Sequence, residues 1–202
     1  MAGFASDVLG PRPAIGGHEL GAEVLLRAVT SNRLVPGRLV LMPCRLHRPL
    51  ERGAWWRAWR MGARVGGLPV ANRLAGHGAR LTLRPELGVK LSAQGNPAAR
   101  DLVRHALADA AGNPGLARSW SRFAARWPPS GSQREVLDQL PRVSVPTLLL
   151  WADHDPAHPL AAAEQALDLI PRAQLRVLED TGFLMAYDDP VGVARELAAF
   201  CI

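Results

Sequence analysis

Apolar residues are arranged along the chain in two patterns, short runs and helical spacing, and each pattern predicts a different kind of element. Short, nearly continuous apolar runs, which are typical of buried strands, occur at 13–17, 38–42, 147–151 and 174–178. Apolar positions with helical spacing predict amphipathic helices at 20–31, 160–170 and 191–200. Because strands that alternate with helices pair in parallel through long crossovers, the pattern predicts an α/β fold with a parallel sheet.

The middle of the chain lacks the strand pattern. Between residues 45 and 140 we predict only helices, at 50–63, 97–111, 114–127 and 132–140. Asn96 and Asn113 precede two of these helices and are typical N-cap residues, because an asparagine oxygen accepts hydrogen bonds from the first backbone N–H groups. We therefore expect a helical insertion at 45–140 between two α/β parts at 1–44 and 141–202. For three tryptophans of the insertion, packing against a neighbouring layer is favoured over lining a substrate pocket: Trp55, Trp56 and Trp59.

The composition is that of one folded domain, since 48% of the 202 residues are apolar and 21% are charged. No apolar run is long enough for a membrane span, and the first residues lack the pattern of a secretory signal, so we expect a cytoplasmic protein. The net charge of +6 comes from scattered arginines without a stacking aromatic motif, which disfavours a nucleic-acid partner. We expect Cys44 and Cys201 to be buried thiols, and we expect no metal and no cofactor.

A glycine-rich turn follows the first predicted strand and reads Gly17-His18-Glu19-Leu20-Gly21. Glycines two residues before and two after a central residue are typical of a strained strand-to-helix elbow, which exposes the central side chain over the end of a sheet. That side chain is normally a nucleophile, and here it is Glu19. The pentapeptide alone is a weak signal, because glycine-rich turns also begin ordinary βαβ units.

The end of the chain carries a more specific pattern. Residues 145–156 read Val-Pro-Thr-Leu-Leu-Leu-Trp-Ala-Asp-His-Asp-Pro, and residues 177–190 contain Thr-Gly-Phe before a proline and a final helix. Together with the elbow, these segments resemble the α/β-hydrolase fold superfamily over residues 5–200. The resemblance implies a parallel sheet with a helical cap, for which the insertion 45–140 is the candidate. The Gly-His-Glu-Leu-Gly elbow is most similar to that of epoxide hydrolases and haloalkane dehalogenases, whose nucleophile is a carboxylate.

The resemblance implies three roles in this sequence. Asp155 matches the acid of the catalytic triad, Glu19 occupies the nucleophile position, and Phe183 stands where the family has its catalytic histidine. Glu19 carries one methylene more than aspartate, which displaces the attacking oxygen by about 1 Å and costs on the order of a hundredfold in rate. Phenylalanine has no basic atom to activate water, so we expect the reaction to stop at an ester of Glu19.

Three other histidines lie near these positions in the sequence. His154 and His158 flank Asp155, and one alternative is that either replaces the missing histidine, but we expect an imidazole on the acid's own loop to approach from the wrong end of the strand. We therefore interpret both as solvent-exposed loop residues. His18 precedes the elbow residue and is interpreted as a packing or supporting group.

Members of this superfamily carry further strands before the elbow, including a loop that contributes to the oxyanion hole. The sequence begins shortly before its elbow, which predicts a truncated homologue with an exposed sheet edge and without efficient turnover. One alternative is an active hydrolase of esters, epoxides or haloalkanes, with Glu19 as nucleophile, a small apolar substrate and the insertion as a lid. Another is a non-catalytic module that pairs through the sheet edge with a partner or with a second copy.

Overall fold

The computed structural model describes residues 8, 10–46, 86–113, 115–116, 118–119, 122 and 137–202. The predicted helix at 50–63, most of the one at 114–127 and the three tryptophans Trp55, Trp56 and Trp59 lie outside the described residues. The chain divides into two compact units. The first contains Met1–Arg48, Leu91–Gln94 and Gln133–Ile202, and the second contains Pro49–Lys90 and Gly95–Ser132.

The first unit is built on a parallel sheet of four strands in the order β1-β2-β3-β4. The strands are β1 (Ala14–Gly17), β2 (Arg38–Leu41), β3 (Thr147–Ala152) and β4 (Ala173–Leu178). All four strands lie where the apolar runs predict them, and the predicted α/β fold with a parallel sheet is confirmed. Within the described part of the chain, β1 pairs on one side only, with β2.

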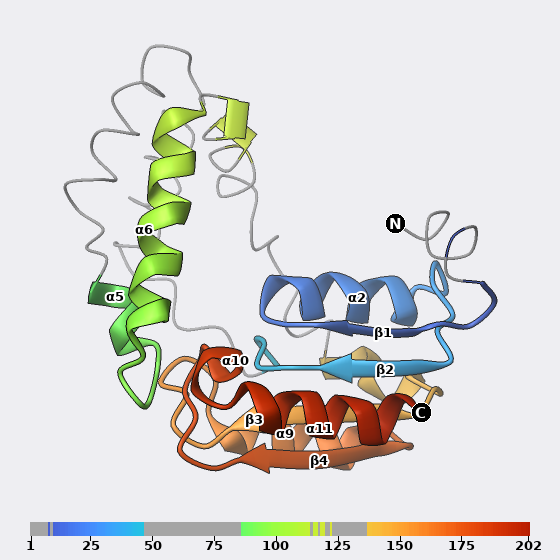
Figure 1. Ribbon diagram of the computed structural model, residues 1–202. Helices are drawn as coiled ribbons and strands as arrows, with labels where there is room; N and C mark the ends of the chain where they lie inside the picture. The colour runs from blue at the N-terminus through green and yellow to red at the C-terminus, as the bar shows by residue number, and fades with distance from the viewer. Residues whose placement is uncertain are drawn as a thin grey trace. The chain divides into compact units, whose positions relative to one another are not determined.

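Helices cover both faces of this sheet, because alternate residues of β2 and β3 point to opposite sides. Leu39, Leu41, Leu149 and Trp151 pack with α2 (Leu20–Thr30) and α9 (Leu160–Leu169). Val40, Leu148 and Leu150 pack with α10 (Met185–Asp188) and α11 (Pro190–Cys201). Figure 1 shows α11 in front of β3 and β4, with α9 behind them. All six residues of β3 are buried, as expected for a central strand between two helical layers.

The described part of the second unit contains α5 (Glu86–Lys90) and α6 (Pro97–Gly112). Helix α6 begins as predicted: the side-chain oxygen of Asn96 accepts the Ala98 N–H at 2.9 Å, and a proline occupies the first turn. The Asn113 side chain likewise accepts N–H groups of the two residues Gly115 and Leu116, as predicted for an N-cap. None of the described helices is long and apolar enough to cross a membrane.

Two smaller expectations have different outcomes. Cys44 is fully buried, as predicted, and burial raises the pKa of its thiol well above the usual value. Cys201 is exposed, so the prediction of a second buried thiol is wrong. It lies in the last turn of α11, where the helix extends past the residues that pack on the sheet.

Candidate active site

Glu19 lies between β1 and α2 in the strained backbone conformation that an elbow requires. Its φ of +49° and ψ of −119° are rare for a residue with a side chain and cost about 1–3 kcal/mol. A Cβ on Gly17 would lie 2.6 Å from backbone atoms of both Gly21 and Ala22, so only glycine fits there. The Glu19 N–H donates to the carbonyl of Pro43 at 2.8 Å and thereby ties the elbow to the segment after β2.

The two other elbow positions are less constrained. Leu20 is the first residue of α2. An added Cβ on Gly21 would meet no described atom within 4 Å, and the residue lies in the ordinary helical region. Close approach of the backbone therefore explains Gly17, whereas nothing among the described residues explains the second glycine.

Asp155 organises the loop that follows β3. Its carboxylate is fully buried, and Oδ1 accepts the backbone N–H groups of Ala157, at 2.7 Å, and of His158, at 3.2 Å. The other oxygen, Oδ2, lies 2.9 Å from Nδ1 of the His158 imidazole. A short acidic side chain that accepts N–H groups two and three residues later folds the chain into a tight turn. This turn brings the His158 side chain back onto the acid.

His158 lies between the two carboxylates. Its side chain is 2% exposed, and its carbonyl accepts the indole N–H of Trp151 at 3.0 Å. Because the Asp155 carboxylate only accepts, the proton in that contact is on Nδ1. The opposite nitrogen, Nε2, lies 3.8 Å from Oε1 of Glu19. The structure thus brings Glu19, His158 and Asp155 together in the order carboxylate, imidazole, carboxylate.

The expectation that an imidazole from the acid's own loop would be exposed and badly placed is therefore wrong for His158. The tight turn reverses the chain within three residues, so the ring points inward from the end of β3. For His154 exposure is confirmed, since its side chain is 61% exposed and contacts Asp153.

Phe183 borders this arrangement from the loop after β4. Its ring stacks on the His158 imidazole, with 5.7 Å between centroids and an interplanar angle of 20°. On another side it meets His18, at 4.7 Å between ring centroids. Phe183 therefore packs its apolar ring against the imidazoles of His18 and His158. It does so at the sequence position where the family resemblance places the catalytic histidine.

His18 is a second, mostly buried imidazole beside Glu19. It forms a hydrogen bond with the backbone of Phe183, and its Nε2 has no hydrogen-bond partner among the described residues. Burial lowers its pKa, although the hydrogen bond to Phe183 and the carboxylates nearby oppose this effect. A neutral imidazole packed against a phenyl ring is consistent with the supporting role expected from the sequence.

Charged residues surround Glu19 on its other side. Arg45 Nε lies 3.7 Å from Glu19 Oε1, the same oxygen that faces His158. Glu23, one helical turn further along α2, is 7% exposed, and burial together with the negative charge of Glu19 raises its pKa to about 7. The positive charges of Arg45 and Arg27 oppose that shift.

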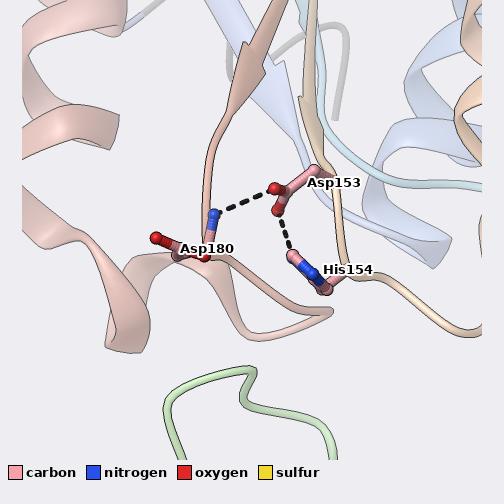
Figure 2. Close-up of side chains that lie close together, drawn as sticks. All are labelled: Asp153, His154 and Asp180. Atoms are coloured by element: carbon pink, nitrogen blue, oxygen red, sulfur yellow. Dashed lines mark hydrogen bonds and ion pairs between the residues drawn. The ribbon is translucent and has the colours of Figure 1, made fainter.

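Asp153, His154 and Asp180 form a separate group at the ends of β3 and β4, with potential ligand atoms within 4.8 Å of one another. Figure 2 shows that the Asp153 carboxylate faces both the His154 ring and the backbone of Asp180. Its two oxygens accept N–H groups of Asp180 and Thr181, each at 3.0 Å, and one of them also contacts His154 Nδ1 at 2.9 Å. The Asp153 carboxylate already has hydrogen-bond partners within this group. The group therefore links the loop after β3 to the loop after β4.

Sequence reasoning singled out Glu19 and Asp155 but did not predict that His158 and Arg45 lie beside Glu19. The signal for His158 is the spacing Asp155-Pro-Ala-His158, in which a turn-forming aspartate precedes an imidazole by three residues. No sequence signal marks Arg45, because the chain contains many scattered arginines.

Comparison with known proteins agrees with this architecture. A family model described as alpha/beta hydrolase fold matches residues 70–190, which include the loops of Asp155 and Phe183 but not the elbow. A search of the curated proteins finds no match.

Three solved structures illustrate the similarity of this fold to known proteins. A thermophilic esterase from Thermogutta terrifontis has 21% identity and a TM-score of 0.69, covering 98% of this chain and 68% of its own. An alpha/beta hydrolase fold protein from Burkholderia ambifaria has 21% identity and a TM-score of 0.71, covering 98% and 69%. A 2-hydroxy-6-oxo-6-phenylhexa-2,4-dienoate hydrolase from a Rhodococcus species has 15% identity and a TM-score of 0.64, covering 94% and 63%.

At identities this low, the solved structures show only that the fold is shared. The family model is matched to the amino-acid sequence, and it covers more than half of the chain. The chain belongs to the α/β-hydrolase fold family.

Proposed function

We propose that this protein is a hydrolase in which Glu19 attacks the substrate and His158, oriented by Asp155, activates the water that releases the product. One observation carries the proposal: His158 lies 2.9 Å from Asp155 through Nδ1 and 3.8 Å from Glu19 through Nε2. The second distance is too long for a hydrogen bond. It leaves Nε2 near the carboxyl carbon that a water molecule must attack.

The first step is displacement at a saturated carbon. An oxygen of the Glu19 carboxylate forms a bond to the carbon of an alkyl halide, and the carbon–halogen bond breaks as the halide leaves with its electron pair. With an epoxide, the ring C–O bond breaks instead and the ring oxygen takes a proton from solvent water, which leaves hydroxide to be neutralised by the proton released in the second step. Either reaction leaves a neutral ester on Glu19. An anionic carboxylate needs no general base for this step.

The second step needs a base. Water attacks Cδ of the Glu19 ester while its proton passes to Nε2 of His158, and Asp155 stabilises the resulting imidazolium. The tetrahedral intermediate then breaks its bond to the alkyl oxygen, which takes the proton from His158 and leaves as an alcohol. Glu19 is regenerated with one oxygen from water. The sum is hydrolysis of the halide to an alcohol and a hydrogen halide.

Two features support small apolar halides and epoxides as substrates, with esters as an alternative class. The Gly-His-Glu-Leu-Gly elbow resembles those of enzymes with a carboxylate nucleophile. The apolar ring of Phe183 borders the base. A serine, the usual nucleophile for ester cleavage, is absent from position 19.

The competing interpretation is a homologue without efficient turnover, which rests on Phe183 at the family's histidine position. That argument requires that no other imidazole reach Glu19. His158 Nε2, 3.8 Å from Glu19, supports the active interpretation. The two interpretations differ in whether an ester of Glu19 forms and whether it is hydrolysed.

Isotope labelling tests the proposal. We expect protein incubated with 1-bromobutane or styrene oxide in ¹⁸O-enriched water to gain about 2 Da on the peptide that contains Glu19, because water replaces the oxygen lost to product. Glu19→Gln should abolish the label and any adduct, and Glu164→Gln, the same change at an exposed position of α9, serves as the matched control. An ester that forms without label would support a protein arrested before hydrolysis. Neither ester nor label with either probe would reject the proposed function.

A further inference from the structure

We propose that Arg45 is a catalytic residue that stabilises the oxyanion formed on the carboxyl group of Glu19 while its ester is hydrolysed. This inference rests on the proposed function, because it assigns a residue to the second step of that reaction. It concerns a charge placed on the nucleophile itself, from the segment that follows β2.

The two oxygens of Glu19 have different surroundings. Arg45 Nε, at 3.7 Å, and His158 Nε2, at 3.8 Å, both face Oε1. The ion pairs of Glu19 within the described residues all involve this oxygen. Oε2 is therefore the oxygen available for attack on a substrate, and Oε1 becomes the carbonyl oxygen of the ester, beside the guanidinium.

The backbone that carries Arg45 is firmly held. Its neighbours Cys44 and Leu46 are buried, at 0% and 1% exposure. Pro43 accepts the N–H of Glu19 through its carbonyl, and the Glu23 side chain forms a hydrogen bond with the backbone of Arg45. The segment 43–46 is thus docked against the elbow at both ends. The Arg45 side chain, 36% exposed, extends from this fixed backbone to Glu19.

The effect of Arg45 must have opposite signs in the two steps. Before attack, Glu19 is an anion that the guanidinium stabilises, and this charge moves to the leaving group during displacement. Arg45 therefore slows the first step slightly. During hydrolysis a neutral ester becomes a tetrahedral oxyanion at Oε1, and a positive charge beside it lowers the barrier.

Glu23 leaves the charge of Arg45 available to Glu19. Among the described residues, the charged and titratable groups that act on Glu23 are Glu19, Arg27, Cys44 and Arg45. Since the pKa of Glu23 is raised to about 7, its carboxyl group is protonated and uncharged in about half of the protein molecules at neutral pH. A neutral Glu23 competes weakly for the guanidinium while still binding the Arg45 backbone.

Rapid-quench mass spectrometry of the intact protein with 1-bromobutane separates the two steps. For Arg45→Met we expect formation of the Glu19 ester to be unchanged or up to about threefold faster, and its hydrolysis to be about 10- to 100-fold slower, so that the ester accumulates. Arg45→Lys, which keeps a cation, should restore at least about half of the lost hydrolysis rate on a logarithmic scale. Arg142→Met, at an exposed arginine away from the site, is the matched control.

The outcomes distinguish this inference from the proposed function. Wild-type turnover with unchanged ester hydrolysis in Arg45→Met overturns the role of Arg45 and leaves the proposed function intact. Equal slowing of both steps also overturns it, because that pattern indicates a lost geometry instead of a lost charge. If wild-type protein forms no ester, both proposals fall together. Should Arg45→Met unfold, the comparison of Arg45→Lys with wild type decides through the same two rate constants.

Discussion

The loops that follow β3 and β4 end at the same edge of the sheet but contribute different chemistry. The loop after β3 carries a carboxylate and an imidazole, those of Asp155 and His158, in contact at 2.9 Å. The loop after β4 contributes the phenyl ring of Phe183, which is stacked on that imidazole. The family resemblance places the base on the second loop. The difference teaches that a site requires an imidazole at a place in space, and that neighbouring parallel strands offer more than one chain position from which to reach it.

The two regions also use their buried carboxylates differently. Asp155 binds the imidazole of His158 as well as two backbone N–H groups. Asp188, in α10, accepts the hydroxyl of Ser92 and the backbone N–H groups of Ala93 and Gly182, so it holds the loop after β4, and none of these partners is an imidazole. Gly182 is required there, since a Cβ would lie 2.7 Å from the carbonyl oxygen of Leu91. One carboxylate contacts the His158 imidazole, and the other holds the loop that carries Phe183.

Moving the imidazole between the loops tests this comparison most severely. We expect His158→Gln to reduce hydrolysis of the Glu19 ester by about a thousandfold, because glutamine takes no proton from water, while ester formation continues. Adding Phe183→His in the same chain should recover at least about tenfold of the lost rate, since the two rings are stacked neighbours. Ester formation and decay, followed by intact mass with 1-bromobutane, give both rate constants.

The control for this exchange is His154→Gln, which changes an exposed imidazole on the same loop and should leave both rate constants at wild-type values. Wild-type ester hydrolysis in His158→Gln would show that the loop after β3 does not supply the base. Full activity of His158→Gln/Phe183→His would show instead that the two positions are equivalent.

Removing the carboxylate of Asp188, which holds the loop that carries Phe183, should lower the stability of the protein more than the rate of ester hydrolysis. We expect Asp188→Ala to lower the free energy of unfolding by about 3 kcal/mol, because buried N–H and hydroxyl donors lose a charged acceptor. Asp189→Ala, which removes the single N-cap bond to Gly192 at 2.8 Å, should cost about 1 kcal/mol. Urea unfolding measures both. A large loss of ester hydrolysis in folded Asp188→Ala would contradict the separation of roles.

The fold of the first unit could be predicted from the sequence because its signals are local and repeat. Each strand is a short apolar run, and the six residues of β3 are all buried between two helical layers. The elbow could also be predicted, since the contact that excludes a Cβ at Gly17 follows from the tight turn at Glu19. These features depend on a few consecutive residues whose chemistry is visible in the chain.

The position of His158 could not be predicted in the same way, because it depends on a turn whose direction is set by hydrogen bonds. Asp155 accepts two N–H groups from residues that follow it, and only this folding of the loop places His158 over Glu19. Family resemblance also directed attention to position 183, where the residue lacks a base. Arg45 carries no pattern at all and is recognised only by its distance from Glu19.

Glu23 on α2, one helical turn from Glu19, is a buried carboxylate whose pKa depends on the fold. The pKa of Glu23 is raised from 4.5 to about 7 in the folded protein, so the native state binds more protons than the unfolded state between these values. Stability contributed by this residue is therefore lost as pH rises from about 4.5 to about 7.

Glu23→Gln removes this dependence. Relative to wild type, we expect its free energy of unfolding to be nearly equal at pH 4.5 and greater by up to about 3 kcal/mol at pH 8, where wild type must bury an ionised carboxylate. Urea unfolding of both proteins from pH 4.5 to pH 8 measures the difference. A gain that is the same at every pH would show that the substitution acts through packing. A gain that rises with pH would assign the change in stability to the titration of Glu23.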